Sequence, residues 1–186
     1  MQGYFKARNN DVVVFDAFYR ENPCGGGYAI ACGLEQVIDY IKNLQFSADD
    51  IRYLQSLNMF DEDFLKYLSS FRFSGSIYAI PEGTVMFPRE PFIKVIAPIM
   101  EAQLVETAIL NILNHQSLIA TKAARVCYAA QNDGVMEFGL RRAQDRIPVF
   151  TVPALLSSAA AAELPTYLQD RFSTFRSKAH TPTDGS

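Results

Sequence analysis

Two adjacent arginines, Arg141 and Arg142, are the residues of this sequence whose type and spacing best suit a chemical task. They follow a short run typical of a strand, residues 135–138, and a glycine at position 139. A guanidinium group can hold a phosphate through two parallel hydrogen bonds, so such a pair at the end of a strand suits a phosphate site. The alternative is a pair of surface arginines in salt bridges, and this motif by itself favours that simpler interpretation.

Three other segments carry residues that chemistry uses. The glycine-rich run 22–27 offers backbone N–H groups, but it lacks the spacing of a phosphate-binding loop, which favours a plain turn. Glu82, in a Pro-Glu-Gly turn, is either a carboxylate in a site or, more commonly, a solvated turn residue. His115 stands between two expected helices with no carboxylate partner in view, which favours a structural role. No Ser-His-Asp order, Cys-His pair or metal-ligand cluster stands out.

The elements that must position these residues alternate between strand and helix. Runs of β-branched and aromatic residues between turns predict strands, and apolar residues three and four apart predict helices. The expected strands are residues 12–19, 76–80, 84–87 and 92–97, with 28–32 as a return strand or the start of a helix. The expected helices begin at 34, 47, 61 and 98, and a further helix covers 117–131. The strands between 76 and 97 are expected to form one small β-unit.

Two of these helix starts carry residues that suit N-caps. Ser47 with Asp50 matches a capping box in which Asp replaces the preferred Glu. Asp61 stands at the equivalent place before the next helix. The two positions therefore predict where these helices begin.

Composition and charge exclude several classes of protein. The chain has 186 residues, 49% hydrophobic and 20% charged, which suits one globular domain or slightly more. A formal net charge of −3 gives no electrostatic footprint for nucleic acid, and no apolar run reaches the ~20 residues of a membrane helix. The first five residues are followed by charged ones rather than by the apolar core of a signal peptide.

The cysteine content favours a reduced, cytosolic setting. The three cysteines are Cys24, Cys32 and Cys127, an odd number without metal-ligand spacing. Cys24 and Cys32 are close enough in sequence to approach each other, but buried or spectator thiols are the simpler interpretation.

Seven collinear runs resemble nicotinate phosphoribosyltransferases. They cover residues 1–144, and together they are highly specific although each alone is weak. The runs are Met-Gln-Gly-Tyr-Phe at 1–5, the segment 18–28 with Pro-Cys-Gly-Gly-Gly-Tyr, Ala-Cys-Gly-Leu-Glu at 31–35, Pro-Glu-Gly-Thr-Val-Met-Phe-Pro-Arg-Glu-Pro at 81–91, and segments 101–107, 114–125 and 137–144.

The resemblance implies an α/β fold of the type II phosphoribosyltransferase kind. Residues 1–97 would form an N-terminal α/β domain, and residues 98–144 two helices and the first strand of an incomplete α/β barrel. The implied reaction joins nicotinate to phosphoribosyl pyrophosphate, giving nicotinate mononucleotide for NAD biosynthesis, with ATP hydrolysis and Mg²⁺ and no prosthetic group or resident metal. The intact family member is expected to be a cytoplasmic homodimer, with no nucleic acid or membrane as partner.

The resemblance also implies roles for three arginines. Arg141 and Arg142 fall in the family's Phe-Gly-x-Arg-Arg-Ala run at the active-site end of the barrel, where pyrophosphate and ribose phosphate need fixed cations. Arg20 and the turn at 23–27 fall in the family segment that approaches an active site, that of a partner subunit. These arginines are the expected substrate-binding and phosphate-binding residues.

Two departures put activity in doubt. The family's Thr-Asp-Leu-Tyr segment, whose Tyr stacks on the pyridine ring, precedes the position matched by Met1 and is absent. The family's later Gly-Thr-His-Ala-His, whose His is phosphorylated to couple ATP, does not occur in residues 145–186. We therefore expect no catalytic residue here and an inactive chain. The alternatives are a non-catalytic dimerisation or binding remnant and a fragment of a nicotinamide-specific phosphoribosyltransferase.

Residues 145–186 are interpreted as a largely unstructured translation of a shifted reading frame. Permitted codons for residues 146–154, read one base out of frame, give the family-like Pro-Asp-Ser-Gly-Ile-Tyr-Gly-Ala-Arg. Two later stretches behave alike, and residues 173–183 yield Gly-Thr-His-Ala-His. The alternative is a natural divergent tail. If the shift is a sequencing error, the true protein is expected to be longer and active.

Overall fold

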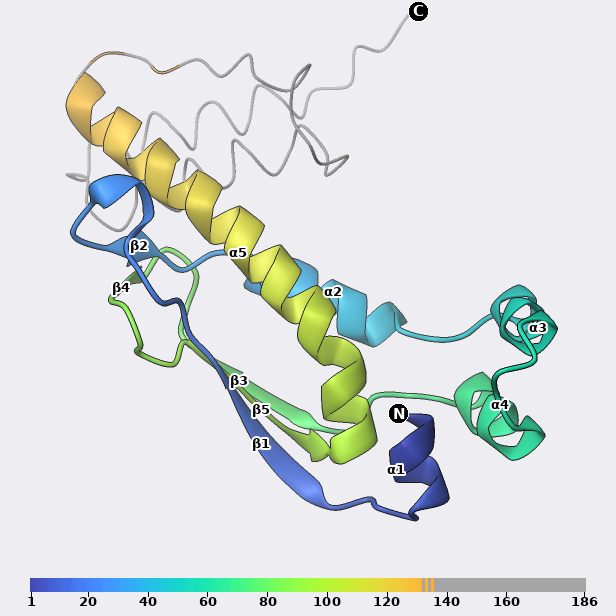
Figure 1. Ribbon diagram of the computed structural model, residues 1–186. Coiled ribbons are helices and arrows are strands. Elements are labelled where there is room, and N and C mark those ends of the chain that lie inside the picture. The colour runs from blue at the N-terminus through green and yellow to red at the C-terminus, as the bar shows by residue number, and fades with distance from the viewer. Residues whose placement is uncertain (132, 134, 136–186) are drawn as a thin grey trace, which may run out of the picture. The chain divides into compact units, whose positions relative to one another are not determined.

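The computed structural model describes residues 1–131, 133 and 135, and it divides into two compact units. Unit 1 comprises Met1–Phe18, Leu34–Ala79 and Pro91–Leu113. Unit 2 comprises Tyr19–Gly33, Ile80–Glu90 and the chain from Asn114 onward. The fold mixes helices and strands as expected (Figure 1). The expected domain boundary between residues 97 and 98 stays a prediction.

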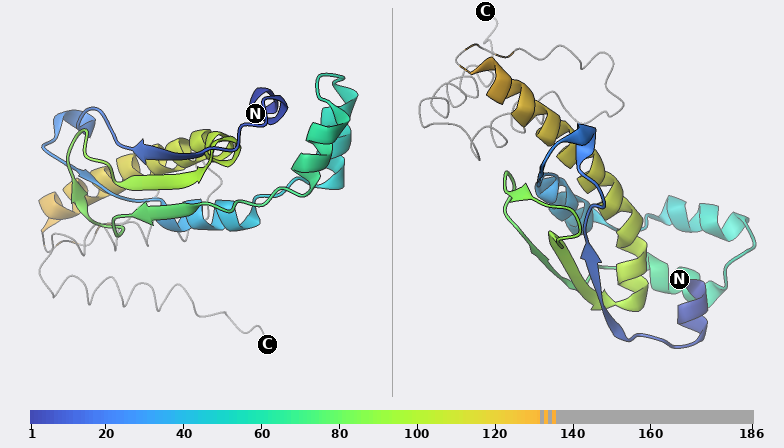
Figure 2. Two further views of the ribbon diagram at one scale, coloured as in Figure 1. Left: turned by 90° about the horizontal axis from the view of Figure 1, so that it is seen from below. Right: turned by 60° about the vertical axis from the view of Figure 1, so that its left-hand side comes forward.

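A three-stranded antiparallel sheet forms the centre of unit 1. Its order is β1 (Val12–Ala17), β5 (Ile93–Pro98), β3 (Ser76–Ala79), so β5 lies in the middle. Alternate residues of β5 are buried. The helix α2 (Leu34–Asn43) and the first half of α5 (Ile99–Ala130) lie over one face of the sheet (Figure 2). This alternation is what a sheet with one covered face requires. The strand predictions for these three segments are confirmed to within two residues at each end.

Four helices complete unit 1 together with the first half of α5. They are α1 (Gln2–Lys6), α2 (Leu34–Asn43), α3 (Ala48–Ser56) and α4 (Glu62–Ser69). The capping box is confirmed, because the Asp50 amide donates to Ser47 Oγ at 3.2 Å and the Ser47 amide donates to Asp50 Oδ2 at 2.8 Å. The short helix α1 is not among the elements that the sequence predicted.

Asp61 is the N-cap residue of α4, but its carboxylate makes no capping hydrogen bond. Lys6 Nζ of α1 lies 2.7 Å from Asp61 Oδ2, and this ion pair lowers the pKa of the Asp61 carboxyl. The position was therefore predicted correctly, while the side chain serves to join two helices. The same two helices also meet through aromatic rings: the Phe5 ring of α1 packs against the rings of Phe64 and Tyr67 of α4, with ring centroids 5.5 Å apart in both cases.

Unit 2 contains a two-stranded antiparallel ladder of β2 (Ala29–Ile30) and β4 (Val85–Met86). The expectation of one β-unit between residues 76 and 97 is therefore wrong, because β3 and β5 pair in unit 1 whereas β4 pairs with β2. Segment 28–32 is a return strand rather than a helix start. The buried side chains of unit 2 include a cluster formed by Ile30, Cys32, Ala120 and Ala124.

A single helix, α5 (Ile99–Ala130), replaces the two helices expected over residues 98–131. Residues 114–117 contain no proline or glycine, and buried side chains continue through them at helical spacing, so nothing local ends the helix. The buried residues around this point are Leu113, Gln116, Ser117, Ala120, Thr121 and Ala124. His115 therefore lies half-buried inside a helix, not at a junction.

Part of the sequence analysis concerns residues that the structure does not describe. The strand expected at 135–138 falls there apart from Val135, as do Arg141, Arg142 and the tail 145–186. Within the described part of the chain, no helix combines the length and the apolar character needed to cross a bilayer.

Candidate functional site

Arg20 lies on a loop of unit 2, Tyr19–Gly27, whose backbone is tied at its beginning. The Tyr19 hydroxyl lies 2.8 Å from the Met86 carbonyl oxygen and 2.9 Å from Asn22 Oδ1, and it donates to one of these acceptors. The Arg89 amide donates to the Tyr19 carbonyl at 2.8 Å. Burial is the main cause that raises the pKa of the Tyr19 hydroxyl, which therefore stays a donor at neutral pH.

The Arg20 side chain is exposed beside this anchor, and it makes no ion pair with any residue that the structure describes. An arginine on a fixed backbone with its guanidinium open to solvent can accept an anion without first breaking a salt bridge. The structure therefore leaves Arg20 in a state that suits the role implied by the resemblance.

The turn predicted at residues 22–27 is confirmed. Cys24 and Gly25 have φ values of 55° and 64°, and the Gly26 amide closes the turn on the Pro23 carbonyl at 3.0 Å. Arg125 Nη1 of α5 donates to the Cys24 carbonyl at 3.2 Å. The hydrogen bonds of this turn are thus those of a plain turn, the interpretation that its spacing favoured.

Glu82 does more than a solvated turn residue would. Its Oε1 accepts a hydrogen bond of 2.7 Å from the Gly33 amide, and the Cys32 thiol lies 3.9 Å from the same oxygen. Gly33 has φ 105°, a conformation that side chains rarely adopt. Glu82 thereby ties the turn before β4 to the chain that leaves β2. Burial, followed by the Glu82 charge, raises the pKa of the Cys32 thiol to about 12.

Two side-chain hydroxyl groups of α5 accept hydrogen bonds from backbone amides in β2 and just after it. The Ile30 amide donates to Thr121 Oγ1 at 2.9 Å, and the Cys32 amide donates to Ser117 Oγ at 3.2 Å. Both side chains are buried. The sequence analysis did not predict a role for these residues. The available signal was their spacing, because a Ser and a Thr four positions apart lie on the same face of a helix, here next to the small Ala120.

The structure brings together only some of the residues with chemical potential. Arg20, Glu82 and His115 all belong to unit 2, and Glu82 binds the Gly33 amide there. No three His, Cys, Asp or Glu side chains of the described residues gather where they could hold a metal ion. The features of this site are therefore an exposed arginine on an anchored loop and a polar network that holds β2.

The thiols should differ sharply in reactivity. Cys24 is exposed, whereas Cys32 and Cys127 are buried and burial raises both of their pKa values. With dithiobis-nitrobenzoate at pH 8 we expect one thiol per native chain to react and all three after denaturation. Cys24→Ser should abolish the native reaction. A native count of two or more would contradict the burial described here.

Comparison with solved structures defines the class of this fold. The structure of human nicotinic acid phosphoribosyltransferase matches with a TM-score of 0.75 and 29% identity, covering 98% of this chain and 40% of that one. Nicotinate-nucleotide pyrophosphorylase from Pyrococcus furiosus matches in fold with a TM-score of 0.62 and 22% identity, covering 85% of this chain and 33% of that one. The fold is that of the N-terminal part of a type II phosphoribosyltransferase.

Sequence comparison identifies the family. The model of the nicotinate phosphoribosyltransferase N-terminal domain matches residues 1–114. Nicotinate phosphoribosyltransferase PncB2 of Mycobacterium tuberculosis is 41% identical over 183 residues, which are 97% of this chain and 40% of that protein. The Bacillus subtilis enzyme is 46% identical over 132 residues, 71% of this chain and 27% of its own. The chain belongs to the nicotinate phosphoribosyltransferase family and spans about 40% of the M. tuberculosis relative.

Proposed function

We propose that this chain is the N-terminal part of an enzyme that forms nicotinate mononucleotide from nicotinate and phosphoribosyl pyrophosphate, with ATP hydrolysis. The single observation that carries this proposal is the family match over residues 1–114, which comprise most of the residues that the structure describes. The reaction would supply NAD biosynthesis in the cytoplasm. The intact enzyme would work as a homodimer.

Arg20 would contact a phosphate group of phosphoribosyl pyrophosphate or of the pyrophosphate product. The anchored loop and the exposed guanidinium support this role, since a preorganised cation stabilises developing charge without reorganising first. Arg141 and Arg142 would provide further cations, an assignment that rests on the resemblance alone. Mg²⁺ would bind together with the phosphate groups of the substrates, as is usual for this ion.

We retain the shifted reading frame as the explanation of residues 145–186. The support for it is that permitted codons for these residues, read in the shifted frame, give family-like sequences in the same order as in the family. The alignment with the M. tuberculosis protein counts against it, because an alignment over 97% of the chain must extend beyond Gln144. Independent sequencing of the locus, together with the intact mass of the expressed protein, distinguishes a shifted frame from a natural divergent tail. A single open frame that codes for all 186 residues, with expressed protein of this length, would contradict the shift.

The purified 186-residue chain, given nicotinate, phosphoribosyl pyrophosphate and Mg-ATP, should form no nicotinate mononucleotide above a control without enzyme. Chromatographic detection of the product measures this directly. Turnover would contradict both the expected inactivity and a purely dimerising or binding role. Product formed with nicotinamide instead of nicotinate would support the nicotinamide-specific alternative.

Arg20→Ala should weaken binding of phosphoribosyl pyrophosphate to the chain by about tenfold or more, as expected for loss of a charge-assisted hydrogen bond. Isothermal titration calorimetry measures the change. Arg52→Ala is the matched control, because Arg52 is also exposed but lies on α3, where it pairs with Asp49. If Arg20→Ala and the unmodified chain bind phosphoribosyl pyrophosphate with equal affinity, Arg20 does not contribute to the phosphate site.

A further inference from the structure

The Tyr19 hydroxyl meets polar groups from three segments of unit 2. Its oxygen lies 2.8 Å from the Met86 carbonyl oxygen of β4 and 2.9 Å from Asn22 Oδ1. Burial raises the pKa of this hydroxyl, and a hydrogen bond with the backbone of Ala29 in β2 lowers it in part. One side-chain oxygen therefore joins the loop that carries Arg20 to both strands of the β2–β4 ladder.

The same hydroxyl holds the chain on both sides of Arg20. Tyr19 and Asn22 stand three positions apart, so the contact between their side chains encloses Arg20 and Glu21. The Arg89 amide fixes the Tyr19 carbonyl at 2.8 Å. That carbonyl belongs to the planar peptide group that also contains the nitrogen and Cα atoms of Arg20. The Arg20 backbone is thus restrained by contacts in which its own side chain takes no part.

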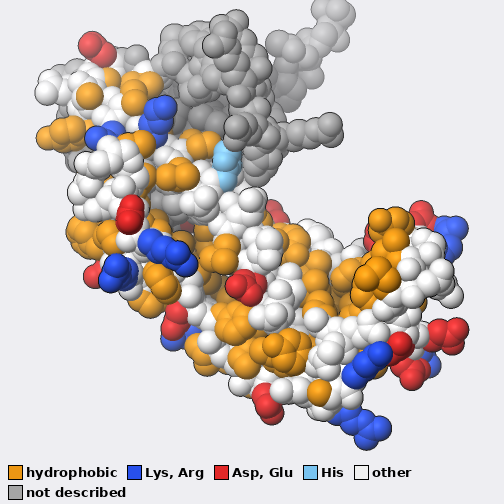
Figure 3. Space-filling model, in the orientation of Figure 1, with side chains coloured by type: hydrophobic (Ala, Val, Ile, Leu, Met, Phe, Trp, Pro, Cys, Tyr) orange, Lys and Arg blue, Asp and Glu red, His pale blue; other side chains and the backbone are white. Residues whose placement is uncertain are grey.

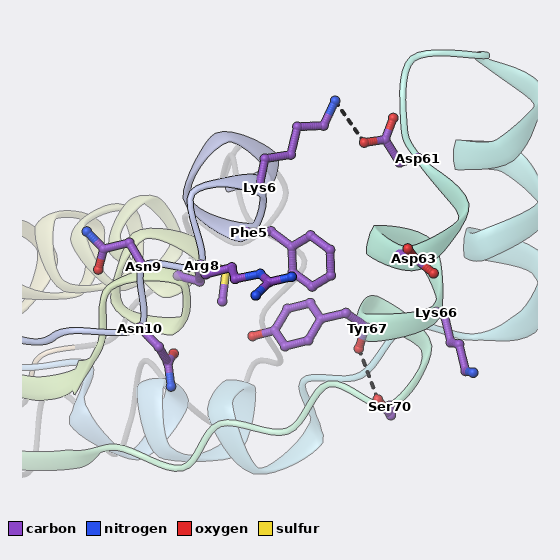
Figure 4. Close-up of a pocket in the computed structure, with 11 residues that line it drawn as sticks. Phe5, Lys6, Arg8, Asn9, Asn10, Asp61, Asp63, Lys66, Tyr67 and Ser70 are labelled. Carbon is purple, nitrogen blue, oxygen red and sulfur yellow. Dashed lines mark hydrogen bonds and ion pairs between the residues drawn. The ribbon is translucent and has the colours of Figure 1, made fainter.

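The Arg20 side chain differs from that of Arg8 in unit 1. Both arginines are exposed, and neither makes an ion pair within residues 1–131. Figure 4 shows the Arg8 guanidinium directed toward the rings of Phe5 and Tyr67, so Arg8 faces its own unit. Figure 3 shows basic side chains at the surface over the part of unit 2 that contains β2 and β4. Arg20 combines a restrained backbone with a charge that is open to solvent.

We propose that Tyr19 is a positioning residue, whose hydroxyl holds Arg20 where the guanidinium meets a phosphate group of phosphoribosyl pyrophosphate. This inference rests on the proposed function, which gives Arg20 its phosphate role. Restraining the backbone in advance strengthens binding, because less conformational entropy is lost when the ligand arrives. Tyr19 acts through Arg20 and does not itself touch the ligand.

Tyr19→Phe removes the hydroxyl and keeps the ring. Phosphoribosyl pyrophosphate should bind to the full chain of this variant about fivefold more weakly than to the unmodified chain, as expected for loss of one hydrogen bond. Isothermal titration calorimetry measures the change. Tyr40→Phe is the matched control: Tyr40 is also half-buried, but it lies on α2 in unit 1, so affinity should not change.

A double variant separates positioning from a general loosening of unit 2. If Tyr19 acts only through Arg20, adding Tyr19→Phe to Arg20→Ala should leave the affinity of Arg20→Ala unchanged. A further loss of affinity in the double variant would overturn the proposal. Equal affinities of Tyr19→Phe and the unmodified chain would overturn it as well, while the proposed function would stand.

The restraint itself can be measured without ligand. The Arg89 amide should exchange its hydrogen at least about fivefold faster in Tyr19→Phe than in the unmodified chain, because its acceptor is held less firmly. Equal exchange would overturn the proposal. A dissociation constant of the unmodified chain for phosphoribosyl pyrophosphate above ~1 mM would contradict the proposed function. The exchange rate would then still decide whether Tyr19 holds the loop.

Discussion

Gly75→Ala is expected to lower the free energy of unfolding by about 3 kcal/mol, the upper end of the usual cost of overpacking. A Cβ atom at this glycine would lie 2.5 Å from Ala97 Cβ and 2.7 Å from the Ile96 carbonyl oxygen. Both atoms belong to β5, the central strand of the sheet, which cannot move without disturbing β1 and β3. Urea unfolding followed by circular dichroism should show a lower midpoint with an unchanged slope.

Gly3→Ala is the control for this experiment. Gly3 lies inside α1, and a Cβ atom there meets nothing within 4 Å. Alanine favours helix over glycine by about 0.5–1 kcal/mol, so this variant should be slightly more stable. If Gly75→Ala costs no more than about 0.5 kcal/mol, as an ordinary surface substitution does, the close approach to β5 described here is wrong.

Thr121→Val is expected to cost about 2 kcal/mol, because it keeps the side-chain shape but leaves the buried Ile30 amide without its acceptor. The hydroxyl also donates to the Ser117 carbonyl at 2.6 Å, within the helix itself. Ser117→Ala should add to the loss, since it removes the partner of the Cys32 amide. Urea unfolding measures both variants and the double variant.

The matched control is Thr84→Val. Thr84 is exposed in a turn, and its hydroxyl donates to the Pro81 carbonyl at 2.7 Å. Water can replace that hydrogen bond, so the loss should stay within about 0.5 kcal/mol. Hydrogen exchange adds a local test: the Ile30 amide should exchange faster in Thr121→Val than in the unmodified chain. Equal exchange in the two proteins would show that Thr121 does not hold β2.

Features governed by neighbours in sequence could be predicted. The capping box at Ser47 and the alternation along residues 93–98 depend on contacts a few residues apart, and the structure contains both. The family itself was visible from collinear runs, and the comparisons bear it out. The turn at 22–27 belongs to the same group, because proline and glycines restrict the backbone locally.

Choices among distant partners could not be predicted. The strand at 85–86 lies between two strands of the sheet in sequence, yet it pairs with Ala29–Ile30 instead. Asp61 has the sequence position of a capping residue, but its carboxylate forms an ion pair with Lys6 instead of a capping hydrogen bond. The helix expected to end before residue 117 continues to Ala130, because burial on both sides of His115 favours continuation.

The sequence by itself therefore determined the family, the α/β character and the local caps and turns of this protein, since these follow from contacts over a few residues or from matched runs. Only the tertiary structure decided that Ser117 and Thr121 hold β2, over separations of 85 and 91 residues. It also decided that Lys6 of α1 pairs with Asp61 at the start of α4. The physical reason is that burial selects such partners across the whole fold, where no local pattern records them.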